Sequence, residues 1–424
     1  MSKETPYSYD EVPYESNPFP QTHPDRLAVM ATLFGMKSKP INRCRVLELG
    51  CASGGNLIPM AVGLPGSSFV GVELSARQVA DGQALIETVG LKNIELRQMS
   101  IMDVNKKFGE FDYIITHGVY SWVPDAVQEK IIEICGTNLA AEGVAYISYN
   151  TYPGWHYRGM IRDMMMYHTK QLPTPQARIV QARALLDFLA QSVPAENNAY
   201  GIMLKNELDL LRNLKDYYLF HEHLEDANRP IYFHEFAEQA ARLGLQYLGE
   251  ADFSAMLASN FQKQVADTLK QVSNDIIRTE QYMDFLRNRT FRQTLFCRKE
   301  VTLKRNLGPS DMRNFYFASS AKPVSEKPDI CSATPEQFRD QAGHTLTTTN
   351  PLVKAVFAHL SEIWPQSASF NDLLTTARAR ASGTLVQDAS ALAREAEVLG
   401  GDLLTAYTAN LVELHTQRDR KSVV

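Results

Sequence analysis

The segment from Arg45 to Asn56, RVLELGCASGGN, constrains the fold of this chain more than any other stretch. A short apolar run of β-forming residues changes there into a loop of small residues, and residues 57–62 follow with a helical pattern. The small residues Gly50, Ala52 and Gly54 would let a ligand approach the backbone closely. A strand, a glycine-rich turn and a helix whose first amides face the turn predict the nucleotide-binding corner of a doubly wound α/β sheet.

Two acidic residues narrow the choice of nucleotide. Glu48 stands just before the first glycine, where a carboxylate repels a pyrophosphate and attracts a cationic amino group. Glu73 ends the next apolar run, at the place where an acid binds ribose hydroxyls in this fold. S-adenosylmethionine has a cationic amino group and no phosphate, so it fits Glu48 better than NAD does. NAD stays an alternative, because the turn also satisfies a relaxed dinucleotide fingerprint and Glu73 suits either nucleoside.

The chain as a whole is organised around a parallel sheet. Within residues 41–155 the strands expected are 45–49, 68–72, 94–98, 111–116 and 143–149, and the helices are 57–63, 76–89 and 125–139. We expect residues 156–228 to form a helical insertion. Residues 229–300 should then return to the core and supply the strands 245–250 and 291–298, the last of them antiparallel. The predicted fold class is α/β, a doubly wound seven-stranded Rossmann-like sheet with helical insertions.

The two ends of the chain lie outside this sheet. Residues 1–40 are expected to form an N-terminal lid and a lead-in helix, because their aromatic and Pro-rich character needs a surface to pack on. Tyr14, Gln21 and Thr22 are the lid residues that we expect at the cofactor site. Residues 301–335, rich in Pro, Ser, Lys and Asn, are predicted to be a linker. Residues 336–424 are predicted to form a mainly helical domain, with a winged helix as one form of it.

Composition excludes several classes of function. Lys plus Arg number 43 against 48 Asp plus Glu, a formal charge of −5, so no basic field indicates a nucleic-acid partner. No apolar run approaches the ~18 residues of a membrane span, and the start of the chain has no apolar leader. We therefore expect a cytoplasmic protein without membrane insertion. The 5 cysteines form no CxxC pair, so reduced thiols are expected and no metal site is. A homodimer is a further expectation.

Residues just after the strands are candidates for chemistry, because ligands in such sheets bind outside the carboxyl ends of the strands. After the third strand, Ser100 and Ile101 could bind an adenine edge, or equally form an ordinary strand exit. After the fourth and fifth strands come two aromatic loops, HGVYSWVP and YNTYPGW. Aromatic faces attract cations, so these loops could form an acceptor mouth and could otherwise pack the sheet edge. The mouth residues are Tyr120 and Trp122, which are the candidate catalytic residues, and Tyr149, Asn150, Tyr152 and Trp155, which are the candidate substrate-binding residues.

Five longer segments carry a family resemblance. They are YDEVPYESNPFPQTHPDRL at 9–27, HGVYSWVP at 117–124, YNTYPGW at 149–155, YLFHEHLED at 218–226 and QYMDFLRNRTFRQTLFCR at 281–298. Together with the glycine-rich corner they resemble the class I S-adenosylmethionine-dependent methyltransferases that carry a methyltransferase regulatory domain. This bacterial family includes protein-lysine methyltransferases that act on outer-membrane proteins.

The resemblance implies roles for the site residues. Glu48, Gly50, Ala52, Gly54 and Asn56 would line the methionine side of S-adenosylmethionine. The ribose would lie at Glu73 and Leu74, the adenine at Ser100 and Ile101, and the sulfonium near His117, Gly118 and Val119. The implied reaction is methyl transfer to a lysine side chain of a protein, with S-adenosylhomocysteine as product. The alternatives are a small-molecule methyltransferase, an NAD-linked oxidoreductase and a non-catalytic cofactor-binding interaction protein.

Overall fold

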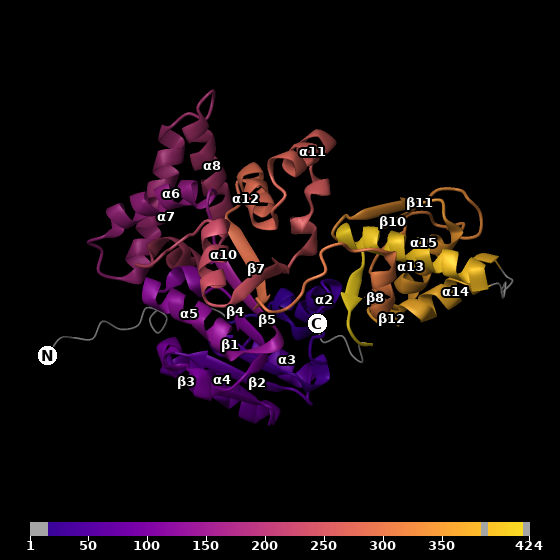
Figure 1. Ribbon diagram of the computed structural model, residues 1–424. Coiled ribbons are helices and arrows are strands. Elements are labelled where there is room, and N and C mark those ends of the chain that lie inside the picture. The colour runs from indigo at the N-terminus through magenta and orange to yellow at the C-terminus, as the bar shows by residue number, and fades with distance from the viewer. Residues whose placement is uncertain (1–15, 383–388, 419–424) are drawn as a thin grey trace.

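The computed structural model describes residues 16–382 and 389–418, which form a sheet-based core, a projecting group of helices and a C-terminal region (Figure 1). Tyr14 and the first part of the expected lid lie outside the described residues. The N-terminal end of the described chain lies beside the core, and the C-terminal region packs at the opposite side of Figure 1.

The core is a seven-stranded sheet with the order β3-β2-β1-β4-β5-β7-β6. Its strands are β1 (Arg45–Leu49), β2 (Ser68–Glu73), β3 (Ile94–Gln98), β4 (Phe111–Thr116), β5 (Leu139–Asn150), β6 (Leu245–Glu250) and β7 (Phe291–Arg298). The first five strands are parallel, and β7 runs antiparallel to both β5 and β6. The structure thus confirms the expected strands, including 245–250 and 291–298 as the last two.

Helices cover both faces of the sheet, because strand residues alternate between two apolar clusters. On β5, Val144 and Tyr146 belong to one cluster, while Ala145 and Ile147 belong to the other. The first cluster holds side chains of α2 (Pro24–Leu33), α3 (Leu57–Gly63) and α4 (Ala76–Val89). The second holds side chains of α5 (Asp125–Asn138) and α10 (Phe233–Arg242). Two covered faces explain the near-continuous apolar runs of the central strands.

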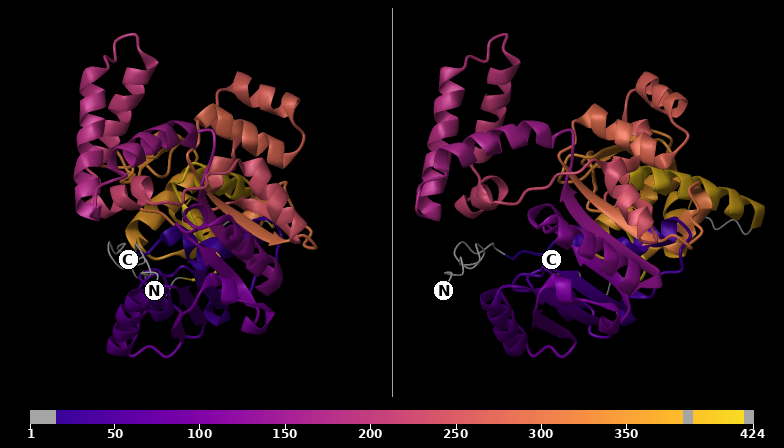
Figure 2. Two further views of the ribbon diagram at one scale, coloured as in Figure 1. Left: turned by 90° about the vertical axis from the view of Figure 1, so that its left-hand side faces the viewer. Right: turned by 60° about the vertical axis from the view of Figure 1, so that its left-hand side comes forward.

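The helical insertion follows β5 and stands away from the sheet (Figure 2). It contains α6 (Trp155–Thr169), α7 (Pro175–Ser192), α8 (Ala199–Arg212), α9 (Asp216–Leu219) and a π-helical turn at Phe220–Leu224. Its helices have a small apolar core of their own, which includes Met165, Leu186 and Leu204. Most of the Met and Leu pattern of this stretch is therefore core, as expected, although Met160 is exposed.

Two further helices lie between β6 and β7, α11 (Lys263–Val272) and α12 (Ile276–Arg287). α12 covers a buried charge cluster, in which Arg292 of β7 contacts Glu250 at 2.6 Å, Asp284 at 2.8 Å and Glu280 at 3.0 Å. A buried arginine needs such partners, because an unpaired charge in the interior is costly. The cluster fixes α12 against the antiparallel edge of the sheet.

The C-terminal region corrects one expectation. Residues 301–335 are not only a linker: the 3₁₀ turn Pro309–Asn314 and the strand β8 (Tyr316–Ala318) belong to the folded region. Met312, Phe315 and Phe317 are buried in its core, and these few apolar side chains are masked by the Pro- and Ser-rich composition around them. The other elements are β9 (Lys322–Pro323), β10 (Glu336–Arg339), β11 (Thr345–Thr348), α13 (Pro351–Ile363), β12 (Ala368–Ser369), α14 (Phe370–Ser382), α15 (Ala389–Thr408) and β13 (Glu413–His415). The region is mainly helical, and its winged-helix character stays a prediction.

Candidate active site

The glycine-rich loop after β1 has a conformation that its small residues make possible. Gly50 has φ +72°, and a Cβ atom there would lie 2.5 Å from a methyl carbon of Val119, in the loop after β4. Ala52 has φ +50°, a left-handed conformation that costs a non-glycine residue energy and occurs mostly where function requires it. Its N–H donates to Glu73 Oε2 at 3.1 Å. The loops after β1, β2 and β4 therefore meet in one place.

Glu48 is a buried carboxylate with one free oxygen. Its Oε1 accepts a hydrogen bond of 2.8 Å from Asn56 Nδ2, while Oε2 is buried and has no partner among the described residues. Burial raises the pKa of Glu48 to about 7, against the bond from Asn56, which lowers it. A buried acceptor without a donor is costly, so this site suits a ligand that brings a cationic N–H group.

The N-terminal segment lies over the glycine-rich loop. The N–H of Phe19 donates to Asn56 Oδ1 at 2.9 Å, and the hydroxyl of Thr22 lies 3.0 Å from Asn56 Nδ2. Gly55 N–H donates to the Ser16 hydroxyl at 2.8 Å. A Cβ at Gly55 would lie 2.4 Å from the Ser16 carbonyl oxygen, so this contact requires glycine. Asn56 thus joins the segment to Glu48.

Glu73 is held by the backbone around it. Its Oε1 accepts the N–H groups of Leu74 at 2.8 Å and Ser75 at 2.9 Å. Among the described residues Oε2 receives the N–H of Ala52 alone, so it retains acceptor capacity for a hydroxyl group. Leu74 is half exposed, at 50%. At the end of the neighbouring strand β3, the Ser100 hydroxyl accepts Met102 N–H at 3.2 Å and caps the 3₁₀ turn that Ile101 begins.

His117 follows β4 and is covered by the N-terminal segment. Its ring centroid lies 3.9 Å from that of Phe19, and its Nδ1 lies 2.9 Å from the Tyr146 hydroxyl. Gln21 also hydrogen-bonds Tyr146. Burial lowers the pKa of His117 to about 4, so the imidazole is neutral at neutral pH. The next residue, Gly118, is exposed, and its N–H donates to the Ser148 hydroxyl at 2.8 Å.

The aromatic loops after β4 and β5 contact each other, but only some of the expected residues take part. Trp122 and Trp155 contact edge to face with their ring centroids 6.1 Å apart. Tyr152 stacks on His156 at 4.1 Å and contacts Tyr232 at 5.2 Å. These rings form a wall at the carboxyl end of β5, in which Trp155 is itself buried, at 1% exposed, and supports Trp122 from behind.

Three of the expected mouth residues do not line the wall. Tyr120 is 0% exposed, with its ring 4.9 Å from that of Phe236 and its hydroxyl donating to Gln239 at 3.2 Å. It packs in the core because the 3₁₀ turn Tyr120–Trp122 directs it toward α10. Tyr149 is likewise buried, 3.0 Å from the Thr294 hydroxyl. Asn150 is buried and lies 3.3 Å from Asn228.

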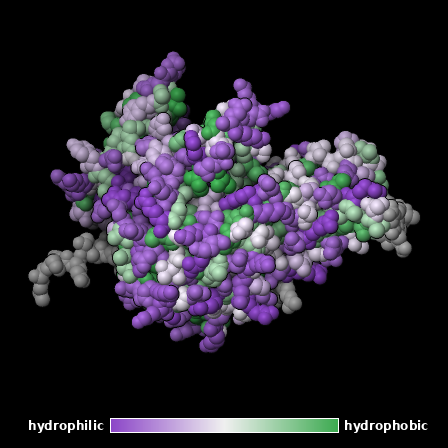
Figure 3. Space-filling model, viewed as in Figure 1, coloured by the Kyte–Doolittle hydropathy of each residue, from purple (hydrophilic) through white to green (hydrophobic). Residues whose placement is uncertain are grey.

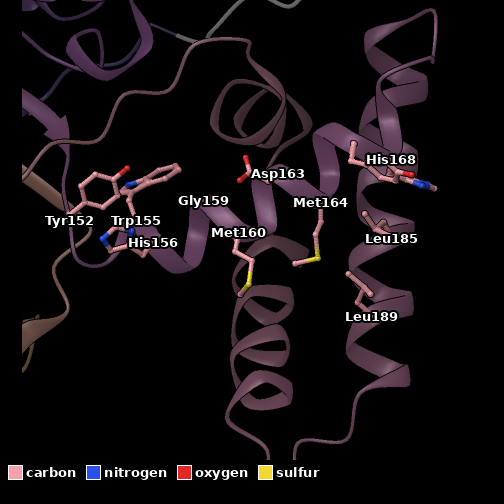
Figure 4. Close-up of a pocket in the computed structure, with 11 residues that line it drawn as sticks. Tyr152, Trp155, His156, Gly159, Met160, Asp163, Met164, His168, Leu185 and Leu189 are labelled. Carbon is pink, nitrogen blue, oxygen red and sulfur yellow. The ribbon is translucent and has the colours of Figure 1, made fainter.

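A pocket of about 680 Å³ adjoins this aromatic wall (Figure 4). Tyr152, Trp155 and His156 form one end of it, and side chains of α6 and α7 form the rest. We name it the insertion pocket; its further lining residues are Gly159, Met160, Asp163, Met164, Tyr167, His168, Leu185 and Leu189.

Several of these site residues were not predicted from the sequence. Ser16 and Phe19 lie in a stretch without periodicity, so only the Pro-Phe-Pro run hinted at a packed aromatic side chain. His156 and Tyr232 join the wall from segments far apart in the chain, and no spacing rule links them. Within residues 16–382 and 389–418, no group of three or more His, Cys, Asp or Glu side chains could hold a metal ion.

Comparison with known proteins identifies the chain. Residues 46–143 match a family model described as a methyltransferase domain, and residues 215–298 match a predicted methyltransferase regulatory domain. An uncharacterized protein of Rickettsia prowazekii is 43% identical over 387 residues, 90% of this chain and 69% of its own length. A second uncharacterized protein of that organism is 39% identical over 57% of this chain and 97% of its own length.

A solved structure agrees along nearly the whole chain. PKMT2 from Rickettsia typhi in complex with AdoHcy superposes with a TM-score of 0.85 at 32% identity, covering 96% of this chain and 78% of that one. The fold and site define an S-adenosylmethionine-dependent methyltransferase. The chain belongs to the family of these enzymes that carries a methyltransferase regulatory domain. The described helices include none that is both long enough and apolar enough to cross a membrane.

Proposed function

We propose that this methyltransferase transfers a methyl group from S-adenosylmethionine to the amine of a lysine side chain on a protein. The observation that carries the proposal is the aromatic wall at the carboxyl ends of β4 and β5, where Trp122 and Tyr152 are partly exposed and the buried Trp155 packs against Trp122. Aromatic faces stabilise cations, and a methylated amine gains the positive charge that the donor loses. The likeness to PKMT2 supports the same acceptor.

In this proposal, the loops after β1 to β4 hold the donor. The free Glu48 oxygen binds its amino group, Glu73 its ribose, and Ser100 and Ile101 its adenine. Gly50, Ala52, Gly54 and Asn56 give the backbone a close approach to its methionine part. Leu74 covers the ribose, while Gln21 and Thr22 close the crevice with Phe19.

The chain's residues then prepare the acceptor. The bound donor supplies an electrophilic methyl group on a sulfonium, and the amine must reach it deprotonated. The aromatic rings exclude water, and loss of hydration lowers the pKa of a lysine amine. His117 is neutral, since its pKa is about 4, so it does not repel the sulfonium near Gly118 and Val119. Alignment and desolvation account for catalysis here without a general base.

Labelled methyl transfer tests the acceptor class. We would incubate the enzyme with methyl-tritiated S-adenosylmethionine and a bacterial lysate and then separate macromolecules from small molecules. The expected label is in protein, and it should be released as methylated lysine on acid hydrolysis. Label found only in small molecules would favour a small-molecule methyltransferase. Binding of the donor without label anywhere would favour a cofactor-binding interaction protein.

We also propose a cytoplasmic location, because all 5 cysteines are free thiols, four of them buried. Oxidising compartments favour disulfides, whereas a reducing one keeps such thiols unpaired. A homodimer remains a prediction, which light scattering on the purified protein tests.

A further inference from the structure

We propose that the insertion pocket between α6 and α7 binds the polypeptide that flanks the acceptor lysine, and that it prefers an apolar residue near that lysine. This inference rests on the proposed function, because it takes a protein as the acceptor. It names the part of the acceptor that the enzyme recognises.

The pocket shares part of its lining with the aromatic wall. Tyr152 and Trp155 belong both to its lining and to the aromatic wall. Trp155 contacts Trp122, the last residue of the short turn Tyr120–Trp122 that directly follows residues His117–Val119. A lysine side chain that lies along the wall therefore has its backbone and neighbouring residues at the pocket.

The lining has a definite chemistry. Met160 and Met164 of α6 face Leu185 and Leu189 of α7, as Figure 4 shows, and flexible thioethers adapt to apolar side chains of different shape. Met160 is 38% exposed, so this apolar surface is open to a partner. Figure 3 shows apolar side chains on the outer surface of the projecting helical insertion.

Charge also favours a lysine-bearing chain. Asp163 lines the pocket with its side chain 81% exposed, and no Lys or Arg is among the lining residues. Arg162 lies 4.0 Å from Asp163 but donates to the carbonyl groups of Glu225 and Asp226. The pocket is therefore mainly apolar, with Asp163 as its one carboxylate beside the imidazoles of His156 and His168, and it complements an apolar and basic segment better than an acidic one.

A peptide library tests the inference. Its members have a fixed central lysine and randomised flanking positions, and the methylated products are identified by mass spectrometry. Wild-type enzyme should enrich Leu, Met or Phe at one flanking position and deplete Asp and Glu. Met160→Glu should lower kcat/KM for the apolar-flanked peptides about tenfold, the scale of discrimination by an apolar pocket. Asp163→Lys should lower it for peptides with a second basic residue.

Matched controls separate recognition from general damage. Val180→Glu introduces the same charge on α7 at a side chain that is 52% exposed and outside the pocket lining. Asp209→Lys makes the same reversal on α8, where the side chain is 57% exposed. Both controls should keep the wild-type preference, and all four variants should bind S-adenosylmethionine as tightly as wild type.

Peptides methylated without preference, or with the same preference in Met160→Glu, would overturn the inference and leave the proposed function intact. If no peptide is methylated, fluorescence anisotropy with fluorescein-labelled library members measures peptide binding directly. Peptide binding that Met160→Glu abolishes would support recognition by the insertion pocket and contradict the lysine acceptor. Absence of peptide binding would overturn recognition by the pocket as well. A change of mass in light scattering for Met160→Glu would assign the surface to a second copy of the chain.

Discussion

At the residue scale, Glu48 should make donor binding depend on pH. Its pKa is raised to about 7 by burial, so below that pH the free enzyme holds the carboxyl protonated and neutral. A cationic amine binds the ionised carboxylate of Glu48, so below pH 7 donor binding must release the proton from Glu48. Affinity for S-adenosylmethionine should fall as pH is lowered below 7, by up to about tenfold per pH unit.

Calorimetry between pH 5.5 and 7.5 checks this, with Glu48→Gln as the matched variant. Glu48→Gln should bind more weakly at pH 7.5 and should lose the pH dependence. Methylthioadenosine, which lacks the amino-acid part, should bind wild type equally at both pH values. A wild-type affinity that does not change with pH would mean that Glu48 does not hold the amine.

Glu73 should contribute to donor affinity through its second oxygen. Glu73→Ala removes the acceptor for the ribose and also the contact with Ala52 N–H. We expect the dissociation constant for S-adenosylmethionine to rise about tenfold, equivalent to about 1.4 kcal/mol. Unchanged affinity in calorimetry would remove Glu73 from the site.

Tyr120 and Trp122 should now behave differently when truncated. Tyr120 is fully buried against Phe236, so Tyr120→Ala should lower the free energy of unfolding by about 3–5 kcal/mol. Trp122 is only partly buried, so Trp122→Ala should stay folded, bind the donor normally and lose methyl transfer. Thermal melts, donor titrations and turnover on the two variants check this. A folded Trp122→Ala enzyme with full turnover would contradict the role of the aromatic wall.

At the element scale, the segment around the turn η1 (Pro20–Thr22) should act as the cover of the donor crevice. It contacts the glycine-rich loop through Asn56 and covers His117 with Phe19. A chain that begins at Pro24 should therefore bind S-adenosylmethionine about tenfold more weakly or worse. Wild-type affinity and turnover in that shortened chain would show that the segment is not a lid.

The elements also show what the sequence could predict. Strands such as 45–49 and 111–116 are apolar on both faces and were predictable, because a parallel sheet covered on both sides needs such runs. The role of Tyr120 was not predictable, because a 3₁₀ turn decides whether an aromatic side chain after a strand faces solvent or α10. The packing of residues 309–318 was not predictable, because its four buried apolar residues, Met312, Phe315, Phe317 and Ala318, stand among polar ones. The contact of Tyr152 with Tyr232 was not predictable either, because no spacing rule links two residues so far apart in the chain.

At the scale of the whole molecule, the C-terminal region is fixed to the core by Asp25 of α2. Asp25 accepts hydrogen bonds from Thr416 N–H at 2.9 Å and the Thr416 hydroxyl at 2.6 Å, and its Oδ2 lies 2.8 Å from His415 Nδ1. Burial raises the pKa of Asp25, but the bonds and charge of His415 and Thr416 outweigh it and leave the pKa below its ordinary value of 3.8. The ionised carboxylate is thus favoured in the folded protein.

A carboxyl group whose pKa is lower in the folded than in the unfolded protein stabilises the fold at pH values above its unfolded pKa. That stabilisation is lost as the pH falls through its folded pKa. Asp25→Asn should therefore destabilise the protein by about 1–3 kcal/mol at pH 7, the cost of weakening buried charged hydrogen bonds. The difference from wild type should begin to shrink as the pH falls below about 3.8, where Asp25 of the unfolded chain becomes protonated while the folded protein still holds it ionised. Urea unfolding at pH 7 and pH 3 checks this, and an equal difference at both would contradict the anchor.

We propose that this enzyme methylates lysine side chains of proteins with S-adenosylmethionine as donor. The most direct test is site-resolved mass spectrometry of bacterial proteins treated with the enzyme and S-adenosylmethionine that carries a deuterated methyl group. We expect deuterated methyl groups on lysine Nζ atoms with the wild-type enzyme and far fewer with Trp122→Ala. Deuterated methyl groups on other residue types alone, or equal labelling of lysine without enzyme, would contradict it.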